Sequence, residues 1–412
     1  MPVVHLKSKH ERKVKKAMTK YKLAFVIERY FEFGGLQRDM RRFALVCAQA
    51  GHAVTVFTGR WDGPDEPTLK VQIIDFRTSS NHGTMQKLDC FVRNLRKQRD
   101  FDCIVGFNRV GGLDVYFGGD LCLKGKLQHQ HRMWLRFLPR YRAYLQLEAS
   151  AFGPTSNTEL MLICPSEAES IRRIYSIATN RIHLLPPGID RNRLIANPLT
   201  AEERNEFRKT FGVSEDELMI LTVGSSFHTK GIDRGIYAIA ALSDNLKKCC
   251  RYVVVGQGNN KKFHAIARKA GIGNRVQFTG GRKDVPNFYY AADLLIHPAR
   301  TETTGSVLLE ALVAGLPVIA TGNCGYAHYI QKAGGGIVCT EPFDHTRFNY
   351  LLGDILTNDK RRAEYGKNGS EYCQNADIYS MVEKGVEIIV NRAKKNREKI
   401  GTTKNTNGHE YC

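Results

Sequence analysis

Two glutamates, Glu302 and Glu310, point most directly to chemistry, because they are acidic residues separated by only seven positions. The apolar run 293–297 before them predicts a buried parallel strand, and residues 305–314 predict a helix. Glu302 therefore falls where a strand ends and a helix begins, which is where open α/β sheets bind their ligands. The small residues Thr303, Thr304, Gly305 and Ser306 leave the first-turn amides of that helix open to an anion or to sugar oxygens.

Glu310 lies further along the same predicted helix, after the apolar run 307–309. This part of the helix has too few polar neighbours to be a surface helix, and an unpaired buried carboxylate is costly. Glu310 therefore needs a partner, and a ligand with hydroxyl groups is one candidate. The alternative is that both glutamates are ordinary solvated side chains, since most carboxylates are exposed. The position of Glu302 at a strand end favours the functional interpretation.

Three further loops follow predicted strands and carry residues suited to a phosphorylated ligand. Gly34 and Gly35 open a helix and would let the backbone approach a phosphate, although paired glycines often serve only close packing. Lys230 follows the first strand of the second half and is placed to hold a diphosphate as a point charge, or is a solvated loop lysine. Arg282, after two glycines, is placed to stack on a flat base.

Several aspartates near the strand 103–107 need separate interpretations. Asp100 and Asp102 resemble a metal-binding Asp-x-Asp pair, but they precede the strand and lie at the wrong edge for a ligand, which favours a structural role. Asp114 and Asp120 follow the strand, so either is a candidate for a polar catalytic or acceptor-binding group.

Residues 124–142 combine basic and aromatic side chains, with six Lys or Arg and no acid. Arg132, Arg136 and Arg140 recur at every fourth position. The apolar residues beside them predict one helical face, although Pro139 interrupts it; they are Met133, Trp134, Phe137, Leu138, Tyr141 and Leu145. This pattern is typical of a segment that binds an anionic membrane surface. A core-facing helix with snorkelling arginines is the alternative, and nucleic-acid binding is disfavoured because no recognisable module is present.

The size and composition of the chain limit the classes of protein it can belong to. Its 412 residues are enough for two or three domains, and a hydrophobic content of 42% excludes global disorder. The net charge of +20 is concentrated in residues 1–22, 124–142 and 392–404, so the rest is nearly neutral. Eleven scattered cysteines without a Cys-x-x-Cys pair predict a reduced protein without disulfides or a zinc site. No apolar run approaches the ~20 residues of a membrane span, and the basic N-terminus lacks the apolar core of a secretory signal, so we expect a cytoplasmic protein.

The order of apolar runs and helical patterns predicts two successive α/β series. Strands are predicted at 22–27, 53–57, 71–74, 103–107, 160–164, 182–185, 218–223, 252–255, 276–279, 294–297, 317–320 and 336–339. Helices are predicted at 36–50, 85–97, 232–242, 261–270, 347–356 and 378–393. The predicted parts are a basic tail 1–21, a first Rossmann-like domain 22–189, a second Rossmann-like domain 190–376, a crossover helix 377–396 and a disordered tail 397–412.

Gly34-Gly35, Lys230 and the Glu302/Glu310 pair, in this order, resemble the retaining glycosyltransferases of family 4, which have the GT-B fold. The resemblance covers about residues 22–390. Within that family, four segments are most similar to the lipopolysaccharide core glucosyltransferases of Gram-negative bacteria; they are 33–39, 111–117, 185–189 and 324–330. The resemblance implies two doubly wound Rossmann-like domains facing a central cleft, with a C-terminal helix that crosses back to the first domain.

The resemblance also implies a role for each residue of the expected site. Glu310 would bind the ribose of UDP, and Glu302, with the amides of residues 303–306, would hold the donor glucose. Gly35 and Lys230 would contact the diphosphate with help from Arg193, offsetting the charge of the leaving group. Asp120 would lie near the anomeric carbon and the acceptor hydroxyl. No metal or other cofactor is expected.

Three residues at two places in the chain depart from the family pattern. Ser225 and Ser226 stand where many members carry an arginine, so diphosphate binding would depend more heavily on Lys230. His328 stands where many members carry an acid.

The resemblance as a whole predicts a peripheral enzyme that moves glucose from UDP-glucose to an inner-core heptose of lipopolysaccharide at the anionic inner-membrane surface. Two alternatives remain at this stage. One is a family 4 enzyme with another nucleotide-hexose or another lipid-linked acceptor. The other is a non-catalytic membrane or nucleic-acid binding protein, which the joint presence of Glu302, Glu310 and Lys230 disfavours.

Overall fold

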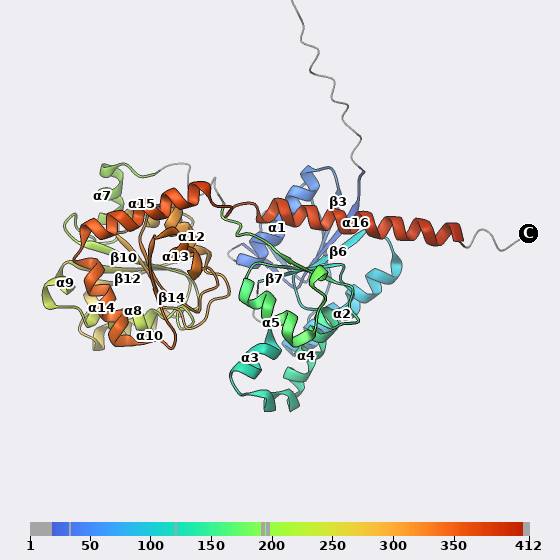
Figure 1. Ribbon diagram of the computed structural model, residues 1–412, viewed down its shortest axis with the longest axis horizontal. Helices are drawn as coiled ribbons and strands as arrows, with labels where there is room; N and C mark the ends of the chain where they lie inside the picture. The colour runs from blue at the N-terminus through green and yellow to red at the C-terminus, as the bar shows by residue number, and fades with distance from the viewer. Residues whose placement is uncertain (1–18, 33, 120–121, 191–193, 195–197, 407–412) are drawn as a thin grey trace, which may run out of the picture. The chain divides into compact units, whose positions relative to one another are not determined.

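The computed structural model describes residues 19–32, 34–119, 122–190, 194 and 198–406, apart from the side chains of residues 129 and 400–406. The chain forms two compact units (Figure 1). The first comprises residues up to Phe117, Trp134–Leu160 and the chain from Val382 onward, and the second comprises Gly118–Met133 and Met161–Met381. The chain contains two large parallel sheets surrounded by helices, which confirms the two predicted α/β series.

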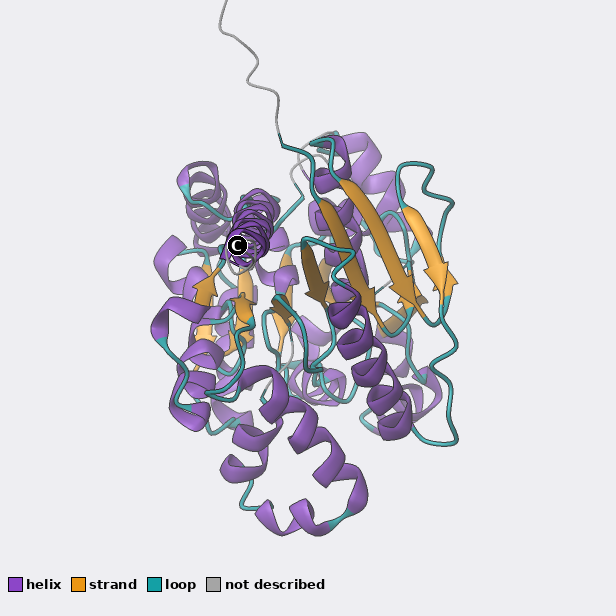
Figure 2. Ribbon diagram, turned by 90° about the vertical axis from the view of Figure 1, so that its right-hand side faces the viewer, coloured by secondary structure: helices purple, strands orange, loops and turns teal. Residues whose placement is uncertain are grey.

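The first sheet has seven strands in the order β5-β3-β1-β6-β7-β8-β9. Its strands are β1 (Lys22–Ile27), β3 (Ala53–Thr58), β5 (Lys70–Ile73), β6 (Cys103–Gly106), β7 (Val115–Gly118), β8 (Glu159–Leu162) and β9 (Ile182–Leu184). The interior strand β1 pairs in parallel with β3 and β6 and is buried at five consecutive positions. A continuous apolar run is what a parallel strand needs when helices cover both faces of the sheet, as Figure 2 shows.

The remaining elements before residue 190 surround this sheet. The helices are α1 (Gly35–Gln49), α2 (Asn81–Gln98), α3 (Leu123–His129), α4 (Pro139–Phe152) and α5 (Pro165–Tyr175). Two short 3-10 helices, η1 (Met133–Phe137) and η2 (Thr179–Arg181), and a two-stranded pair of β2 (Tyr30–Phe31) with β4 (Trp61–Asp62) complete this part.

The last helix, α16 (Met381–Thr406), packs against the first unit, which confirms the predicted return of the C-terminal helix. Gly385 lies against the ring of Phe43, where a Cβ atom would collide with the ring. Further along, Arg397 forms an ion pair with Asp102, which also accepts from the backbone N–H of Lys22 at 2.7 Å. The prediction of a disordered tail from residue 397 is therefore wrong as far as residue 406, because this contact was not visible in the sequence pattern. The structural interpretation of Asp102 is confirmed.

The second sheet has six strands in the order β12-β11-β10-β13-β14-β15. Its strands are β10 (Leu218–Val223), β11 (Cys250–Val255), β12 (Val276–Gly280), β13 (Leu294–His297), β14 (Val318–Thr321) and β15 (Gly336–Cys339). The surrounding helices are α7 (Ala201–Thr210), α8 (Ile232–Ala240), α9 (Asp244–Lys248), α10 (Asn260–Lys269), η3 (Gly273–Arg275), α11 (Val285–Ala291), α12 (Ser306–Val313), α13 (Ala327–Ala333), α14 (His345–Leu356) and α15 (Asp359–Asn375). All of the strand pairs in this sheet are parallel.

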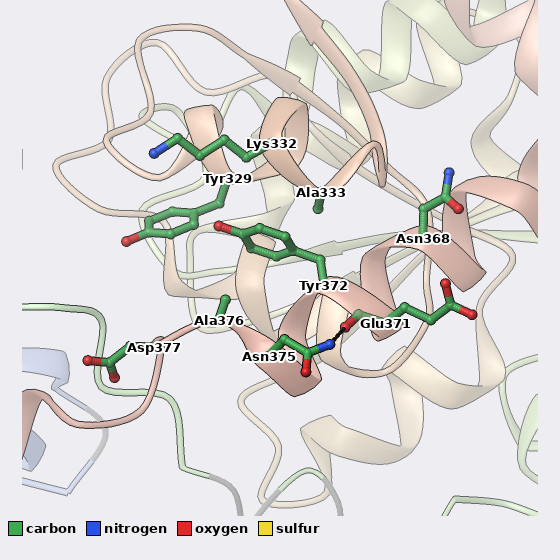
Figure 3. A pocket seen from close by; sticks show the side chains of 9 residues that line it. All are labelled: Tyr329, Lys332, Ala333, Asn368, Glu371, Tyr372, Asn375, Ala376 and Asp377. Atoms are coloured by element: carbon green, nitrogen blue, oxygen red, sulfur yellow. Dashed lines mark hydrogen bonds between the residues drawn. The ribbon is translucent and has the colours of Figure 1, made fainter.

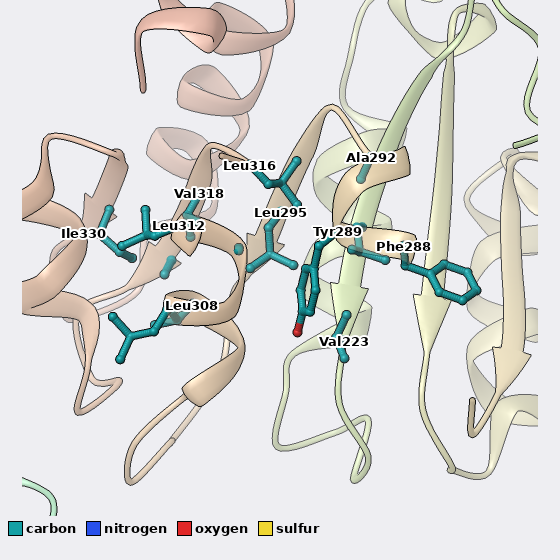
Figure 4. Close-up of a cluster of buried hydrophobic side chains, with 14 of the residues drawn as sticks. Val223, Phe288, Tyr289, Ala292, Leu295, Leu308, Leu312, Leu316, Val318 and Ile330 are labelled. Carbon is teal, nitrogen blue, oxygen red and sulfur yellow. The ribbon is translucent and has the colours of Figure 1, made fainter. Parts of the chain in front are cut away.

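Two hydrophobic cores cover the two faces of the second sheet. One contains the apolar side chains of α8, α10 and α14, and the other contains those of α11, α12 and α13. In the second core, Leu295 of β13 lies between Leu312 of α12 and Tyr289 of α11 (Figure 4). Because β13 and α12 are both fixed by this core, the loop between them starts and ends on rigid elements.

Arg208 of α7 is a buried charge in the second unit, with only 1% of its surface exposed. Its guanidinium donates to Asp293 and to the carbonyl of Ala291, each at 2.9 Å. Asp293 keeps Arg204 as a second partner, at 2.7 Å. Replacing Arg208 by methionine is therefore expected to lower the free energy of unfolding by about 1–3 kcal/mol, because the buried carbonyl of Ala291 loses this donor.

Scanning calorimetry measures the effect of this substitution. The control is Arg361→Met, which removes a half-exposed ion pair with Asp354 and is expected to cost less than about 1 kcal/mol. Equal melting shifts for the two variants would contradict the account.

Candidate functional site

The strand order of the second sheet brings the loops that carry Lys230 and Glu302 together. In the chain β10 is followed by β11, which pairs on one side of β10, whereas β13 pairs on its other side. This reversal is a topological switch point, where open α/β sheets leave room for a ligand at the carboxyl ends of the strands. Lys230 follows β10 and Glu302 follows β13, so both lie at this point.

Lys230 and Glu302 form an ion pair with each other in the structure. The side chain of Lys230 is 20% exposed and that of Glu302 is 13% exposed. Burial lowers the pKa of Lys230 below the usual 10.5. A Cβ atom on Gly224 would lie 3.0 Å from Lys230 Cε, so the glycine leaves the space that the lysine side chain occupies.

Arg300 joins the two loops through a bidentate ion pair with Asp233 of α8, at 2.6 and 2.8 Å. Its backbone N–H also donates to the carbonyl of Thr229 at 2.8 Å, directly before Lys230. The backbone at Gly231, which has φ +69°, passes so close to Pro298 that no Cβ would fit there. These contacts fix the position of Lys230 relative to Glu302, and the sequence reasoning missed Arg300 and Asp233.

The loop 302–305 leads into α12 in the way that the sequence predicts. Gly305 caps the helix in the left-handed conformation, with φ +82°, and Ser306 is the first helical residue. The carbonyls of Glu302 and Thr304 accept from the N–H groups of Gly325 and Tyr326 at 3.1 and 2.8 Å, which fixes the loop. The amide of Leu308 donates to the carbonyl of Gly305 at 2.9 Å. The amides before it in the first turn have no acceptor within the helix, which suits them to binding a ligand.

Glu310 has a partner within the protein. The hydroxyl group of Tyr289 on α11 donates to Glu310 Oε2 at 2.6 Å, and Figure 4 shows the Tyr289 ring at the edge of the hydrophobic core. Arg282 forms a bidentate ion pair with Asp284 at 2.7 and 2.8 Å and lies over the ring of Phe288. The predicted contacts of Glu310 with a ribose and of Arg282 with a base remain predictions.

The other predicted site residues belong to different parts of the chain. Gly35 is the first residue of α1 in the first unit, and a Cβ atom there would meet nothing within 4 Å, so close packing does not explain this glycine. Asp120 and Arg193 lie outside the described residues. Asp114 is buried and accepts from the N–H of Ile104 at 3.0 Å and from Arg96 at 3.0 Å. The expectation that Asp114 serves a ligand is wrong, because these contacts make it a structural residue.

The basic aromatic segment does not form one helix. The chain turns between α3 and η1, and Pro139 begins α4 instead of interrupting it. Trp134 and Phe137 are 62% and 75% exposed, so the alternative of a core-facing helix is wrong for these residues. The guanidinium of Arg136 lies 4.9 Å from the centre of the Phe137 ring. Arg132 and Arg140 are also exposed.

A separate hollow of about 700 Å³ lies on the α13–α15 side of the second unit (Figure 3). The rings of Tyr329 and Tyr372 line it with their centres 6.5 Å apart, and Asn375 donates to the carbonyl of Glu371 at its floor. None of its described lining residues is among the predicted site residues. Nor do the described residues contain a group of three or more His, Cys, Asp or Glu side chains arranged to hold a metal ion.

The two parallel sheets and the switch point define an α/β protein built from Rossmann-like domains, and comparisons with known proteins give its family. Residues 33–193 match the profile described as glycosyltransferase family 4, and residues 203–372 match that of glycosyl transferases group 1. The chain is 38% identical over 367 residues to lipopolysaccharide glucosyltransferase WaaG of Escherichia coli K12, covering 89% of this chain and 98% of that protein. The chain belongs to the family 4 glycosyltransferases and is a hexosyltransferase.

Solved structures confirm the GT-B fold. A crystal structure of WaaG, described as a glycosyltransferase involved in lipopolysaccharide biosynthesis, matches with a TM-score of 0.84 at 38% identity, over 89% of this chain and 99% of that one. A structure of Anabaena HepE in complex with UDP and glucose matches with a TM-score of 0.68 over 90% of this chain and all of that one. Because HepE is only 17% identical to this chain, its match supports the fold alone.

Proposed function

We propose that this protein transfers glucose from UDP-glucose to an inner-core heptose of lipopolysaccharide, with retention of the anomeric configuration. The single observation that carries the proposal is the 38% identity with WaaG, which extends over nearly the whole of both chains. The site supports it, because Lys230, Glu302 and the N-terminus of α12 place a cation, an anion and helix-end amides at the same edge of the second sheet.

Each group has a distinct task in the proposed reaction. Lys230 binds the diphosphate and stabilises the charge that grows on UDP as the glycosidic bond breaks. Glu302 and the amides of residues 303–306 hold the sugar hydroxyls, and Glu310 binds the ribose while Tyr289 orients its carboxylate. The proposal also assigns Gly35 and Arg193 to the diphosphate and Asp120 to the acceptor. No metal ion is required in this proposal, because cationic side chains meet the diphosphate.

A donor panel tests the proposed donor. The purified protein is titrated calorimetrically with UDP-glucose, UDP-galactose, GDP-mannose and UDP alone. We expect UDP-glucose to bind more tightly than UDP-galactose, because galactose turns its C4 hydroxyl away from groups placed to hydrogen-bond it and leaves them unpaired. GDP-mannose is expected to bind weakest, because its base differs as well as its sugar. Equal affinity for the three sugar nucleotides would overturn the glucose assignment and favour another hexose donor.

The acceptor is anchored in a membrane, and the segment around η1 is suited to reach it at the cytoplasmic face of the inner membrane. The structure has no helix among its described residues that is long and apolar enough to span a bilayer. Trp134, Phe137 and Leu138 are exposed apolar side chains, and the exposed Arg136 and Arg140 accompany them. Aromatic side chains that enter the interface and arginines that meet anionic headgroups together give a peripheral attachment.

The double substitution Trp134→Ser with Phe137→Ser is expected to weaken binding to anionic vesicles by about tenfold or more, because burial of each ring contributes about 1.5–3 kcal/mol. Co-sedimentation with vesicles that contain phosphatidylglycerol measures this. Tyr350→Ser is the matched control, since Tyr350 is 71% exposed but lies on α14 in the second unit. Binding of the wild type that is equal for neutral vesicles, or that is insensitive to salt, would contradict the electrostatic contribution.

A further inference from the structure

His297 is a buried imidazole directly beneath the Lys230–Glu302 ion pair. It is the last residue of β13, and none of its surface is exposed. Neither of its ring nitrogens has a hydrogen-bond partner among the described residues, although Nε2 lies 3.4 Å from Glu302 Oε2. Buried polar groups are nearly always paired, so an unpaired imidazole at the centre of a site needs an explanation.

The charge state of His297 limits what it can do. Burial, together with the positive charge of Lys230, lowers the pKa of His297 to about 3. The imidazole is therefore neutral at physiological pH and carries a single N–H group. It cannot form an ion pair with Glu302, but it can donate one hydrogen bond to it. The residue was not singled out in the sequence, where a histidine ends an otherwise apolar strand.

In the proposed donor complex, Lys230 and Glu302 each gain a new partner. Lys230 and Glu302 now satisfy each other, whereas the proposed function assigns Lys230 to the diphosphate and Glu302 to the sugar. When Lys230 turns to the diphosphate, Glu302 Oε2 loses its charged partner while the side chain remains mostly buried. A carboxylate in such a position needs a replacement donor. His297 Nε2 lies within a small movement of that oxygen.

We propose that His297 is a positioning residue whose Nε2–H donates to Glu302 once Lys230 has moved to the diphosphate, and thereby holds the carboxylate toward the sugar hydroxyls. This inference rests on the proposed function and names a further residue for it. In the structure, Lys230 pairs with the same Glu302 oxygen that lies closest to His297 Nε2. His297 acts on the sugar through Glu302 and does not touch the nucleotide.

The proposal predicts that replacing His297 weakens the binding of UDP-glucose without changing the binding of UDP. His297→Leu, an apolar replacement of similar size, is expected to weaken UDP-glucose binding by about tenfold and to leave UDP binding unchanged. Its melting temperature without ligand is expected to equal or exceed that of the wild type, because an unpaired buried imidazole is removed. A residue needed only for packing would instead lower the melting temperature and weaken both ligands.

Two further variants keep the test decisive if His297→Leu does not fold. His297→Gln places an amide N–H near the position of Nε2, whereas His297→Asn places it near Nδ1. Calorimetric titration of each folded variant with UDP and with UDP-glucose is expected to show His297→Gln close to the wild type and His297→Asn weakened only toward UDP-glucose.

Equal UDP-glucose to UDP affinity ratios in all variants and the wild type would overturn the role of His297. If the wild type binds UDP but not UDP-glucose, the proposed donor is wrong and the inference falls with it. The two failures are therefore distinguishable within the same set of titrations.

Discussion

Glu302→Gln is expected to lower the rate of glucose transfer by about a hundredfold or more, which is the usual cost of removing one charged contact to the reacting group. Glutamine keeps the size of the side chain but loses the negative charge that pairs with Lys230 and that the proposal assigns to the sugar hydroxyls. The effect falls mainly on kcat if Glu302 interacts more strongly with the sugar as its positive charge develops in the transition state. Initial rates at saturating UDP-glucose measure it.

The matched control for this experiment is the same substitution at Glu310. Glu310→Gln keeps a group that can accept from Tyr289, and the carboxylate is assigned to the ribose, far along α12 from the reacting bond. We expect it to raise KM for UDP-glucose more than it lowers kcat, because a ribose contact is the same in the ground state and the transition state. The account would be wrong if the two variants had the same kinetic profile, or if Glu302→Gln had the activity of the wild type.

Lys230→Ala is expected to reduce kcat by about a hundred- to a thousandfold, because no other described side chain is assigned to neutralise the departing diphosphate in the second unit. Lys230→Arg keeps the charge and is expected to retain part of the activity. The loss in Lys230→Ala should appear for every UDP-sugar in a donor panel, since the diphosphate is common to them. An alanine variant with more activity than the arginine variant would contradict this role.

The pH profile gives an independent test of Lys230. Burial lowers its pKa, so its positive charge is lost at a lower pH than that of an exposed lysine. The value of kcat/KM, which reports the free enzyme, is therefore expected to fall as pH rises through this lowered pKa. In Lys230→Arg the alkaline decline should be absent, because a guanidinium stays protonated. A decline of the same shape in both proteins would assign it to another group.

The sequence predicted the strands of the site well, for a physical reason. Leu218–Val223 and Leu294–His297 were predicted with the bounds that the structure shows, because strands buried on both faces are continuous apolar runs. The strand Val115–Gly118 was missed, since only four residues lie between glycine-rich turns. The helix Asp359–Asn375 was missed because its buried side is formed by Gly366, Gly369 and Cys373, which produce no hydrophobic period.

The contacts between side chains were harder to predict from the sequence than the helices and strands. The sequence placed Lys230 and Glu302 after strands, as the structure shows. Their ion pair was not predicted, because it requires β10 to lie beside β13, and these two strands are not consecutive in the chain. The Arg300–Asp233 pair and the position of His297 depend on the same strand order. For Glu310 the sequence predicted the need for a partner, and the structure supplies Tyr289 from a separate helix.

The most direct test of the central claim is the product of a single reaction. The protein is incubated with UDP-glucose labelled with ¹³C at the anomeric carbon and with lipopolysaccharide that ends at its inner-core heptoses, and the product is examined by NMR. The account predicts release of UDP and one new α-linked glucose on a heptose, at a rate greatly reduced in Glu302→Gln. A β-linked product, transfer to water alone, or equal product from the Glu302→Gln protein would contradict it.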